Sequence, residues 1–404
     1  MNDTDDGGTK NKNQAKKIIF VNTHPIQYFA PLYAYCNKEG LRVDAWYCSD
    51  ESIRGEKDVQ FGRAVKWDIP LLDGYPYRFF KNYSWKPSIH TGFFGLINIG
   101  MMIALFKEPK SIIIVHGWGY LTLLLVIMFG KLAGHTVCLR SETPYKQEKL
   151  HSSLKLLLRK LFLQQFMFRL IDKFLFVGKQ NKEFYKHYGV KNNALIFVPY
   201  AVDNNRFDKD YQKLKSEKEN LKESLGIPLS NFVIIYSGKY IPKKRPIDLL
   251  KAFYLINNDK SSLVMIGEGE LRGQLEQYIA DNKVNNVNLT GFINQSSISS
   301  YYAIGDVFVM CSQEGETWGL SINEAMNFEL PVVASDLVGS TDDLIVNDET
   351  GYTYKCGNVN ELSDVLGQLS INTELRKRLG RNSKEKIDQY SYKVIKNNLQ
   401  ILLQ

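Results

Sequence analysis

The sequence contains no apolar run long enough to cross a lipid bilayer. A membrane-spanning helix needs about 20 consecutive apolar residues, and the longest candidates in this chain of 404 residues are FFGLINIGMMIALF and YLTLLLVIMFG. We therefore expect both to form buried helices. Residues 1–16, MNDTDDGGTKNKNQAK, have no apolar core, and they predict a disordered tail rather than a signal or transit peptide.

Cysteine is scarce, and negative charge is in the minority. The five cysteines are widely separated, odd in number and mostly surrounded by apolar residues: Cys36, Cys48, Cys138, Cys311 and Cys356. This pattern favours reduced thiols in a cytoplasm over disulfides or zinc, so we expect no bound metal. The formal net charge of +8 is spread along the chain and favours anionic partners without choosing among them. No zinc finger or aromatic RNA-binding box is present, so nucleic acid is not an expected partner.

Short runs of β-branched residues alternate with longer amphipathic stretches. In the first half these runs are KKIIFVN, RVDAWYC, SIIIVHG, HTVCLRS, KFLFVG and ALIFVPY. A polar segment, DKDYQKLKSEKENLKESLGIPLS, interrupts the alternation, which restarts with NFVIIYSG, SSLVMIG, NVNLTG, DVFVMCS and LPVVAS. Strands alternating with helices form parallel sheets covered by helices. The sequence therefore predicts an α/β chain of two doubly wound units.

The interruption also predicts the domain boundaries. After the tail over 1–16, we expect an N-terminal domain over 17–205, a C-terminal domain over 206–385, and a last helix within 386–404 that packs back on the N-terminal domain. Ligands of doubly wound sheets bind beyond the C-terminal ends of the strands. Two facing units would therefore share a ligand cleft.

Three glutamates surround a glycine in SQEGETWGLSINEAMNFELPVVAS, where a helix is predicted to begin. Glu316 precedes this helix and Glu324 lies within it, with Gly319 between them. A helix N-terminus binds phosphate, and a glycine lets a large ligand approach the backbone. Beside such a diphosphate, Glu316 would reach a sugar hydroxyl and Glu324 ribose hydroxyls, whereas Glu314 has neither position. The alternative is that these acids only complement the helix dipole.

A lysine-rich turn, SGKYIPKKRP, follows a predicted strand and precedes a helix that begins near Pro246. We expect Lys239 and Lys244 to project into the cleft, where two ammonium groups would neutralise a diphosphate and stabilise it as a leaving group. The alternative is a solvated basic turn.

These segments resemble glycosyltransferase family 4, whose members are retaining, nucleotide-sugar-dependent enzymes of the GT-B fold. The family pattern has a Gly-Arg-Leu turn, a Lys five residues beyond its Arg, and a two-glutamate motif. The corresponding segments here are SGKYIPKK and ETWGLSINEAM, the latter followed by PVVAS. The resemblance is strong over residues 237–353, weaker in the first half and absent from the tail. It implies a GT-B fold with two facing Rossmann-like domains and an interdomain cleft.

The resemblance also implies roles for individual residues. Glu316, His116 and Lys244 would be catalytic. The donor would be bound by Gly238, Lys239, Lys244, Thr317, Trp318, Gly319, Leu320 and Glu324. Lys239 stands where the family usually has Arg, so the charge is kept but the bidentate fork toward phosphate is lost.

The first half carries a histidine that follows a central strand, His116 in IIIVHGWG. Family members commonly have a His there, near the donor sugar. The alternative is a structural histidine whose hydrogen bonds are satisfied at the end of the strand. The loop THPIQYFAPL lacks the Gly-Gly pair of many members, so its contact with the donor phosphate is not expected. His24 and Gln27 of this loop would instead face the acceptor, although His24 before a proline is also compatible with a role in shaping the turn.

The stretch over 150–176 is rich in Leu and Phe, with Lys and Arg interspersed. A basic amphipathic helix of this kind can lie on an anionic membrane. In a doubly wound domain the same pattern is more often a helix packed on the sheet with a solvated basic face. Both interpretations stay open from the sequence, and a lipid-linked acceptor would favour the first.

Together, these features predict a metal-independent hexosyltransferase that needs no cofactor beyond its donor substrate, a nucleotide diphosphate sugar. The acceptor would be a hydroxyl of a glycan or lipid-linked molecule, as in polysaccharide, lipopolysaccharide or glycolipid biosynthesis. The location would be cytoplasmic, with peripheral contact at the inner face of the cell membrane if the membrane interpretation holds. The alternatives are a GT-B sugar-nucleotide epimerase and a catalytically silent sugar-nucleotide-binding partner.

Overall fold

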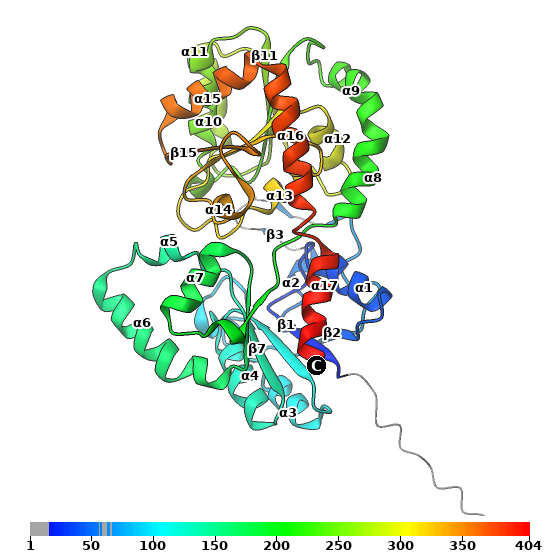
Figure 1. Cartoon of the computed structure of the whole chain (residues 1–404), viewed down its shortest axis with the longest axis vertical. Coiled ribbons are helices and arrows are strands. Elements are labelled where there is room, and N and C mark those ends of the chain that lie inside the picture. The colour runs from blue at the N-terminus through cyan, green and yellow to red at the C-terminus, as the bar shows by residue number, and fades with distance from the viewer. Residues whose placement is uncertain (1–15, 56, 59–62, 65–66) are drawn as a thin grey trace, which may run out of the picture.

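The computed structural model describes residues 16–55, 57–58, 63–64 and 67–404. Residues 1–15 of the predicted tail lie outside the described residues. The described chain forms two α/β units, one above the other in Figure 1, and each is built around a parallel sheet. The predicted fold class is confirmed.

The first sheet has seven parallel strands in the order β5-β2-β1-β6-β7-β8-β9. They are β1 (Ile18–Asn22), β2 (Val43–Tyr47), β5 (Tyr77–Phe79), β6 (Ile112–His116), β7 (Thr136–Arg140), β8 (Lys173–Phe176) and β9 (Leu195–Phe197). Six of the seven coincide with predicted runs. β5 was not predicted, because this edge strand has three residues, two of them exposed, and no apolar run marks it.

The second sheet has six strands in the order β12-β11-β10-β13-β14-β15. They are β10 (Phe232–Ser237), β11 (Ser261–Ile266), β12 (Val287–Gly291), β13 (Val307–Met310), β14 (Val332–Ser335) and β15 (Gly351–Tyr354). Only β15 was not predicted. A further antiparallel pair joins β3 (Lys57–Asp58) to β4 (Arg63–Ala64).

Helices cover both faces of each sheet (Figure 1). In the first unit they are α1 (Ala30–Lys38), α2 (Glu51–Arg54), α3 (Ile99–Lys107), α4 (Leu121–Leu132), α5 (Tyr145–Glu148), α6 (Ser153–Gln165) and α7 (Lys179–His187). The later helices are α8 (Asn204–Leu214), α9 (Lys218–Ser224), α10 (Pro246–Ile256), α11 (Arg272–Asn282), α12 (Ile298–Ala303), α13 (Leu320–Met326), α14 (Thr341–Leu344), α15 (Val359–Ile371), α16 (Thr373–Ile387) and α17 (Tyr392–Gln400).

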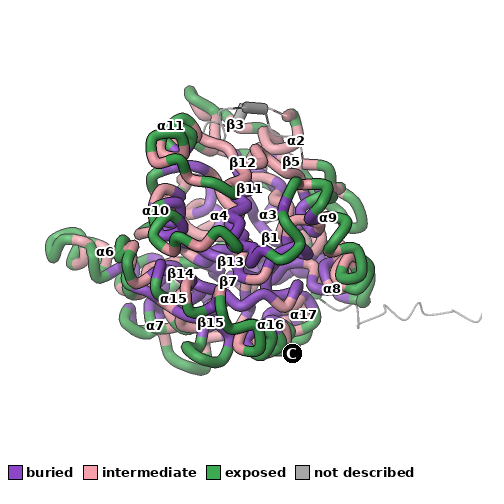
Figure 2. The backbone as a smooth tube through the Cα atoms, turned by 90° about the horizontal axis from the view of Figure 1, so that it is seen from above, coloured by how far each residue is buried: buried purple, intermediate pink, exposed green. Residues whose placement is uncertain are grey.

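The central strands are buried on both faces, which explains their nearly continuous apolar sequences. In β1, Ile19 and Val21 join the core on one face of the sheet, while Ile18 and Phe20 join the core on the other. Figure 2 shows these buried strands in the interior and exposed backbone at the periphery. No helix among the described residues is long and apolar enough to cross a membrane.

The two apolar stretches expected to form buried helices are α3 and α4, and the prediction holds only partly. α4 buries one side, including Leu123 and Val126, against the sheet. α3 buries Met101 and Leu105 but leaves Ile103 and Phe106 more than half exposed. A surface helix needs only one apolar stripe for packing, so its other apolar residues can remain in contact with solvent.

The last helix, α17, lies against the first unit although it follows the second in the chain (Figure 1). It contacts α1 and β9, and Nδ2 of Asn398 donates a hydrogen bond of 2.7 Å to the carbonyl oxygen of Phe197. The chain thus crosses between the units after β9 and again after α16.

Candidate active site

A cavity with a volume of about 790 Å³ lies between the two units. The first unit lines it with loop residues that follow its strands, including His24, Gln27 and Tyr28. The second unit contributes the lysine turn and the glutamate segment. Strands β10 and β13 are parallel neighbours, so the segments that follow them meet at one edge of the sheet. This adjacency brings together residues more than 70 positions apart.

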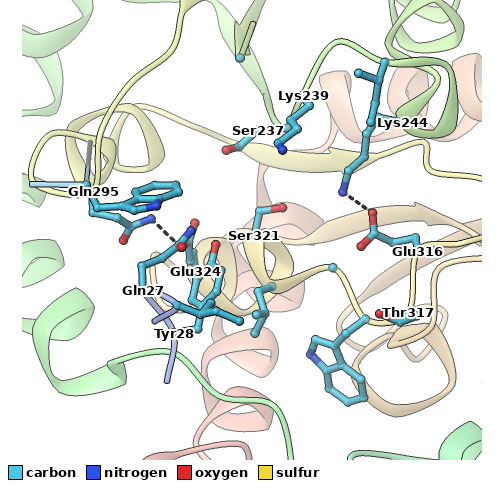
Figure 3. Close-up of a pocket in the computed structure, with 18 of the residues that line it drawn as sticks. Gln27, Tyr28, Ser237, Lys239, Lys244, Gln295, Glu316, Thr317, Ser321 and Glu324 are labelled. Atoms are coloured by element: carbon cyan, nitrogen blue, oxygen red, sulfur yellow. Dashed lines mark hydrogen bonds and ion pairs between the residues drawn. The ribbon is translucent and has the colours of Figure 1, made fainter. Parts of the chain in front are cut away.

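Lys244 and Glu316 form an ion pair that faces the cavity (Figure 3). Oγ of Ser312 donates a second hydrogen bond, of 3.2 Å, to Oε2 of Glu316. Burial alone would raise the pKa of Glu316, but the Lys244 ammonium, supported by Lys243, holds it below the usual value of 4.5. At neutral pH the cavity therefore contains a charged carboxylate beside a cation.

Lys239 lines the same cavity at the end of β10. Figure 3 shows its side chain next to Ser237, on the side of the cavity that also carries Lys244. The Tyr236 hydroxyl donates a 3.1 Å hydrogen bond to the Lys239 carbonyl oxygen and holds the turn. The lysine turn thus supplies cationic groups to one wall, as an anionic ligand requires.

Glu324 lies on α13 at the other end of the cavity (Figure 3). Its carboxylate accepts hydrogen bonds from the Tyr302 hydroxyl at 2.7 Å and from Nε2 of Gln295 at 3.2 Å. Burial raises the pKa of Glu324, and these two hydrogen bonds oppose the rise only in part. Arg206 donates to Oε1 of Gln295 at 2.7 Å, which orients the amide nitrogen of Gln295 toward Glu324.

Gly319 stands directly before α13, with a φ of 92° that favours glycine. A Cβ there would come within 2.6 Å of the Met310 sulfur, so the missing side chain faces the protein interior. From the sequence, this glycine was expected to let a ligand approach the backbone. The structure gives another reason for it: backbone conformation and tight packing.

Gln147 of α5 reaches from the first unit to the glutamate segment of the second. Its Nε2 donates to the carbonyl oxygens of Glu316 and Leu337, both at 3.0 Å, and its Oε1 accepts from the backbone N–H of Gly315 at 3.1 Å. One buried side chain of the first unit therefore holds the backbone of the glutamate segment in the second unit.

Of the three site residues predicted in the first half of the chain, two lie at the cavity and the third does not. His24 and Gln27 line the cavity. Burial, followed by the charge of His90, lowers the pKa of His24 to about 4, so its ring is neutral at neutral pH. His116 is not in the cavity lining. Its ring packs against Phe29, with centroids 4.7 Å apart, and its Nε2 is buried without a hydrogen-bond partner among the described residues.

The other residues predicted to bind the donor also line the cavity. Glu314, which was expected to have no contact with the donor, does not. The lining includes Gly238, Thr317, Trp318, Gly319 and Leu320. Glu314 is exposed and is not part of the lining.

Tyr28, Ser237, Gln295 and Ser321 are among the cavity residues that the sequence did not identify. Ser237 lies in the lysine-rich turn, Ser321 lies in the two-glutamate motif, and Tyr28 follows Gln27. Their positions next to predicted site residues were the available signal. Gln295 follows β12 without a motif of its own.

The facing parallel sheets, with a cavity between the C-terminal ends of their strands, define the GT-B fold. Known structures agree over nearly the whole chain. The crystal structure of Anabaena Alr3699/HepE in complex with UDP and glucose superposes with a TM-score of 0.70 at 16% identity, covering 96% of this chain and 99% of that one. WaaG, a glycosyltransferase involved in lipopolysaccharide biosynthesis, superposes with a TM-score of 0.65 at 14% identity, covering 96% and 99%. At these identities the likeness concerns the fold.

Sequence comparison relates part of the chain to a known family. Residues 217–386 match the family described as glycosyl transferases group 1. The matched segment is less than half of the chain, and it is similar in sequence to this family, which corresponds to glycosyltransferase family 4. Two curated relatives are capsular polysaccharide biosynthesis glycosyltransferase CapM of Staphylococcus aureus, 25% identical over 55% of this chain and 56% of its own length, and sulfoquinovosyl transferase SQD2 of Arabidopsis thaliana, 29% identical over 50% and 38%. The chain thus spans about half or less of the length of these relatives.

Proposed function

We propose that this protein is a retaining glycosyltransferase that moves a hexose from a nucleotide diphosphate sugar to a hydroxyl of a glycan or lipid-linked acceptor. One observation carries the proposal: the Lys244–Glu316 pair, Lys239 and Glu324 line one cavity between the units. The lysines would hold the diphosphate, Glu316 would contact the donor sugar, and Glu324 would bind the ribose. HepE, a structural neighbour, has been crystallised with UDP-glucose, which supports a nucleotide-sugar donor.

The charges suggest how transfer would proceed. A glycoside hydrolase places two carboxylates across the scissile bond, but here Glu324 is held at the far end of the cavity by Tyr302 and Gln295. We therefore favour a front-face route: the bond from the anomeric carbon to the donor phosphate breaks, the acceptor oxygen bonds on the same face, and its proton passes to the departing phosphate. Lys239 and Lys244 would stabilise that leaving group without a metal ion.

The acceptor would enter from the first unit. His24 and Gln27 line the cavity from the first unit, and a neutral His24 can donate a hydrogen bond to a sugar hydroxyl or accept one from it. We assign His116 no contact with the donor in this arrangement. Free cysteines, most of them buried, support a cytoplasmic site of reaction. Cell-surface polysaccharide or glycolipid biosynthesis is the pathway class that we propose.

The test is a binding screen with UDP-, GDP- and ADP-sugars, followed by turnover with membrane extract as the acceptor source. We expect release of the nucleoside diphosphate, acceptor-dependent transfer with retained anomeric configuration by NMR, and activity that persists in a chelator. Conversion of the sugar nucleotide without acceptor would establish the epimerase alternative. Binding without any product would establish the silent partner.

A further inference from the structure

Helix α6 (Ser153–Gln165) presents leucines to solvent instead of to the core. Leu154, Leu157, Leu158 and Leu161 are each more than half exposed, and Leu154 reaches 67%. Their spacing of i, i+3, i+4 and i+7 places them in one stripe along the helix. Figures 1 and 2 both show α6 projecting from the edge of the first unit.

The opposite side of α6 holds the helix to the protein. Leu163 is fully buried, and the Arg159 guanidinium forms a 2.8 Å ion pair with Glu148 and lies over the ring of Trp118. These two residues are spaced i and i+4, so they occupy the face turned inward. The exposed stripe is therefore a second apolar face, which packing within the described chain does not use.

The charges around the exposed stripe all have one sign. No acid lies between Glu148 and Asp172, whereas this interval contains five basic residues. With about 3.6 residues per turn, Lys155 and Lys160 lie on opposite edges of the leucine stripe, and both are exposed. Lysines at the borders of an apolar face can extend to phosphate headgroups while the leucines enter the acyl boundary.

We infer that the outer face of α6 docks on a bilayer surface that contains anionic lipid. Two copies of α6 would bring like charges together without an acid on either helix, so self-association through this face is disfavoured. α6 directly follows α5, whose Gln147 contacts the Glu316 segment. Docking would therefore hold the cavity beside the membrane. The inference goes beyond the proposed transferase function, and lipid binding is measurable without donor or acceptor.

The experiment is sedimentation of the full-length protein with sucrose-loaded vesicles, either phosphatidylcholine alone or phosphatidylcholine and phosphatidylglycerol in equal parts. We expect salt-sensitive binding to the anionic vesicles and at least about tenfold weaker binding to the neutral ones. Leu157→Gln/Leu161→Gln and Lys155→Glu/Lys160→Glu should each weaken anionic binding by about tenfold or more. Because all four side chains are exposed, the melting temperature should not change.

Matched controls come from exposed positions elsewhere. Ile371→Gln removes an exposed apolar side chain at the end of α15, and Lys209→Glu/Lys213→Glu reverses two exposed lysines of α8. Both controls should bind like the unmodified protein. Absence of binding to anionic vesicles, or equal loss in the controls, would overturn the inference. A dimer of the unmodified protein that Leu157→Gln/Leu161→Gln dissociates would overturn it in favour of a second copy.

Discussion

Nε2 of Gln147 donates a hydrogen bond of 3.0 Å to the backbone carbonyl of Glu316, across the boundary between the two units. The same side chain also accepts from the N–H of Gly315. Gln147 therefore fixes the backbone beside the proposed catalytic carboxylate relative to the first unit. Gln147 would act on the reaction by positioning Glu316, because its side chain hydrogen-bonds to backbone groups.

Gln147→Leu keeps the approximate size of the side chain but removes all these hydrogen bonds. We expect turnover to fall by about ten- to hundredfold, because small displacements of reacting groups are costly, while donor affinity changes less. The neighbouring variant Lys146→Ala is the control. It removes an exposed ion pair to Asp342 across the same boundary, and such pairs contribute little. Equal losses in both variants would mean that general contact between the units matters, rather than the position of Glu316.

Lys244→Ala should lower turnover by about ten- to a thousandfold, the scale for removing a preorganised charge from a transition state. It also leaves the buried Glu316 carboxylate without its main cation, so we expect a lower melting temperature in the ligand-free protein. Lys251→Ala, on an exposed position of α10, controls for loss of positive charge. Normal turnover of folded Lys244→Ala would show that this lysine has no role in transfer.

Most strands could be predicted from the sequence, and so could the meeting of the lysine turn and the glutamate segment in one cleft; the ion pair between Lys244 and Glu316 could not. Double-sided burial makes the strands visible as apolar runs, and parallel neighbours such as β10 and β13 bring the residues that follow them together. Gln147 was not accessible, because its partners depend on how the two units face each other. The sequence of α6 allowed both a packed and a membrane-bound helix. Only the structure shows that the leucine stripe faces outward.

The three glutamates should differ in kinetic effect. Glu316→Gln should chiefly depress turnover, because the carboxylate lies beside Lys244 at the proposed reacting centre. Glu324→Gln should weaken donor binding at least as much as turnover, because it would contact the non-reacting ribose. Glu314→Gln is the matched control at an exposed position and should be mild in both. Donor affinity and turnover of all three are measured under the same conditions. Should Glu314→Gln be the most damaging while Glu316→Gln stays near normal, the assignment of roles is wrong.

We also expect the ionised Glu324 carboxylate to lower the stability of the fold while it contributes to donor binding. Burial raises the pKa of Glu324 above the usual 4.5, so the folded chain binds this proton more tightly than the unfolded chain does. The free energy of unfolding should therefore fall as the pH rises from 4.5 through the folded pKa, and the cost is complete above it. Glu324→Gln removes that cost, and its amide can still pair with Tyr302 and Gln295.

At neutral pH the ligand-free Glu324→Gln variant should accordingly melt a few degrees above the unmodified protein, while binding the donor more weakly. Its advantage should shrink as the pH approaches 4.5, where the carboxyl of the unmodified protein becomes protonated. The measurement is a series of thermal melts across this pH range, with Glu314→Gln as the control expected to follow the unmodified protein throughout. A lower melting temperature for Glu324→Gln at neutral pH would show that the ionised carboxylate stabilises the fold, and the proposed balance between stability and donor binding would then be wrong.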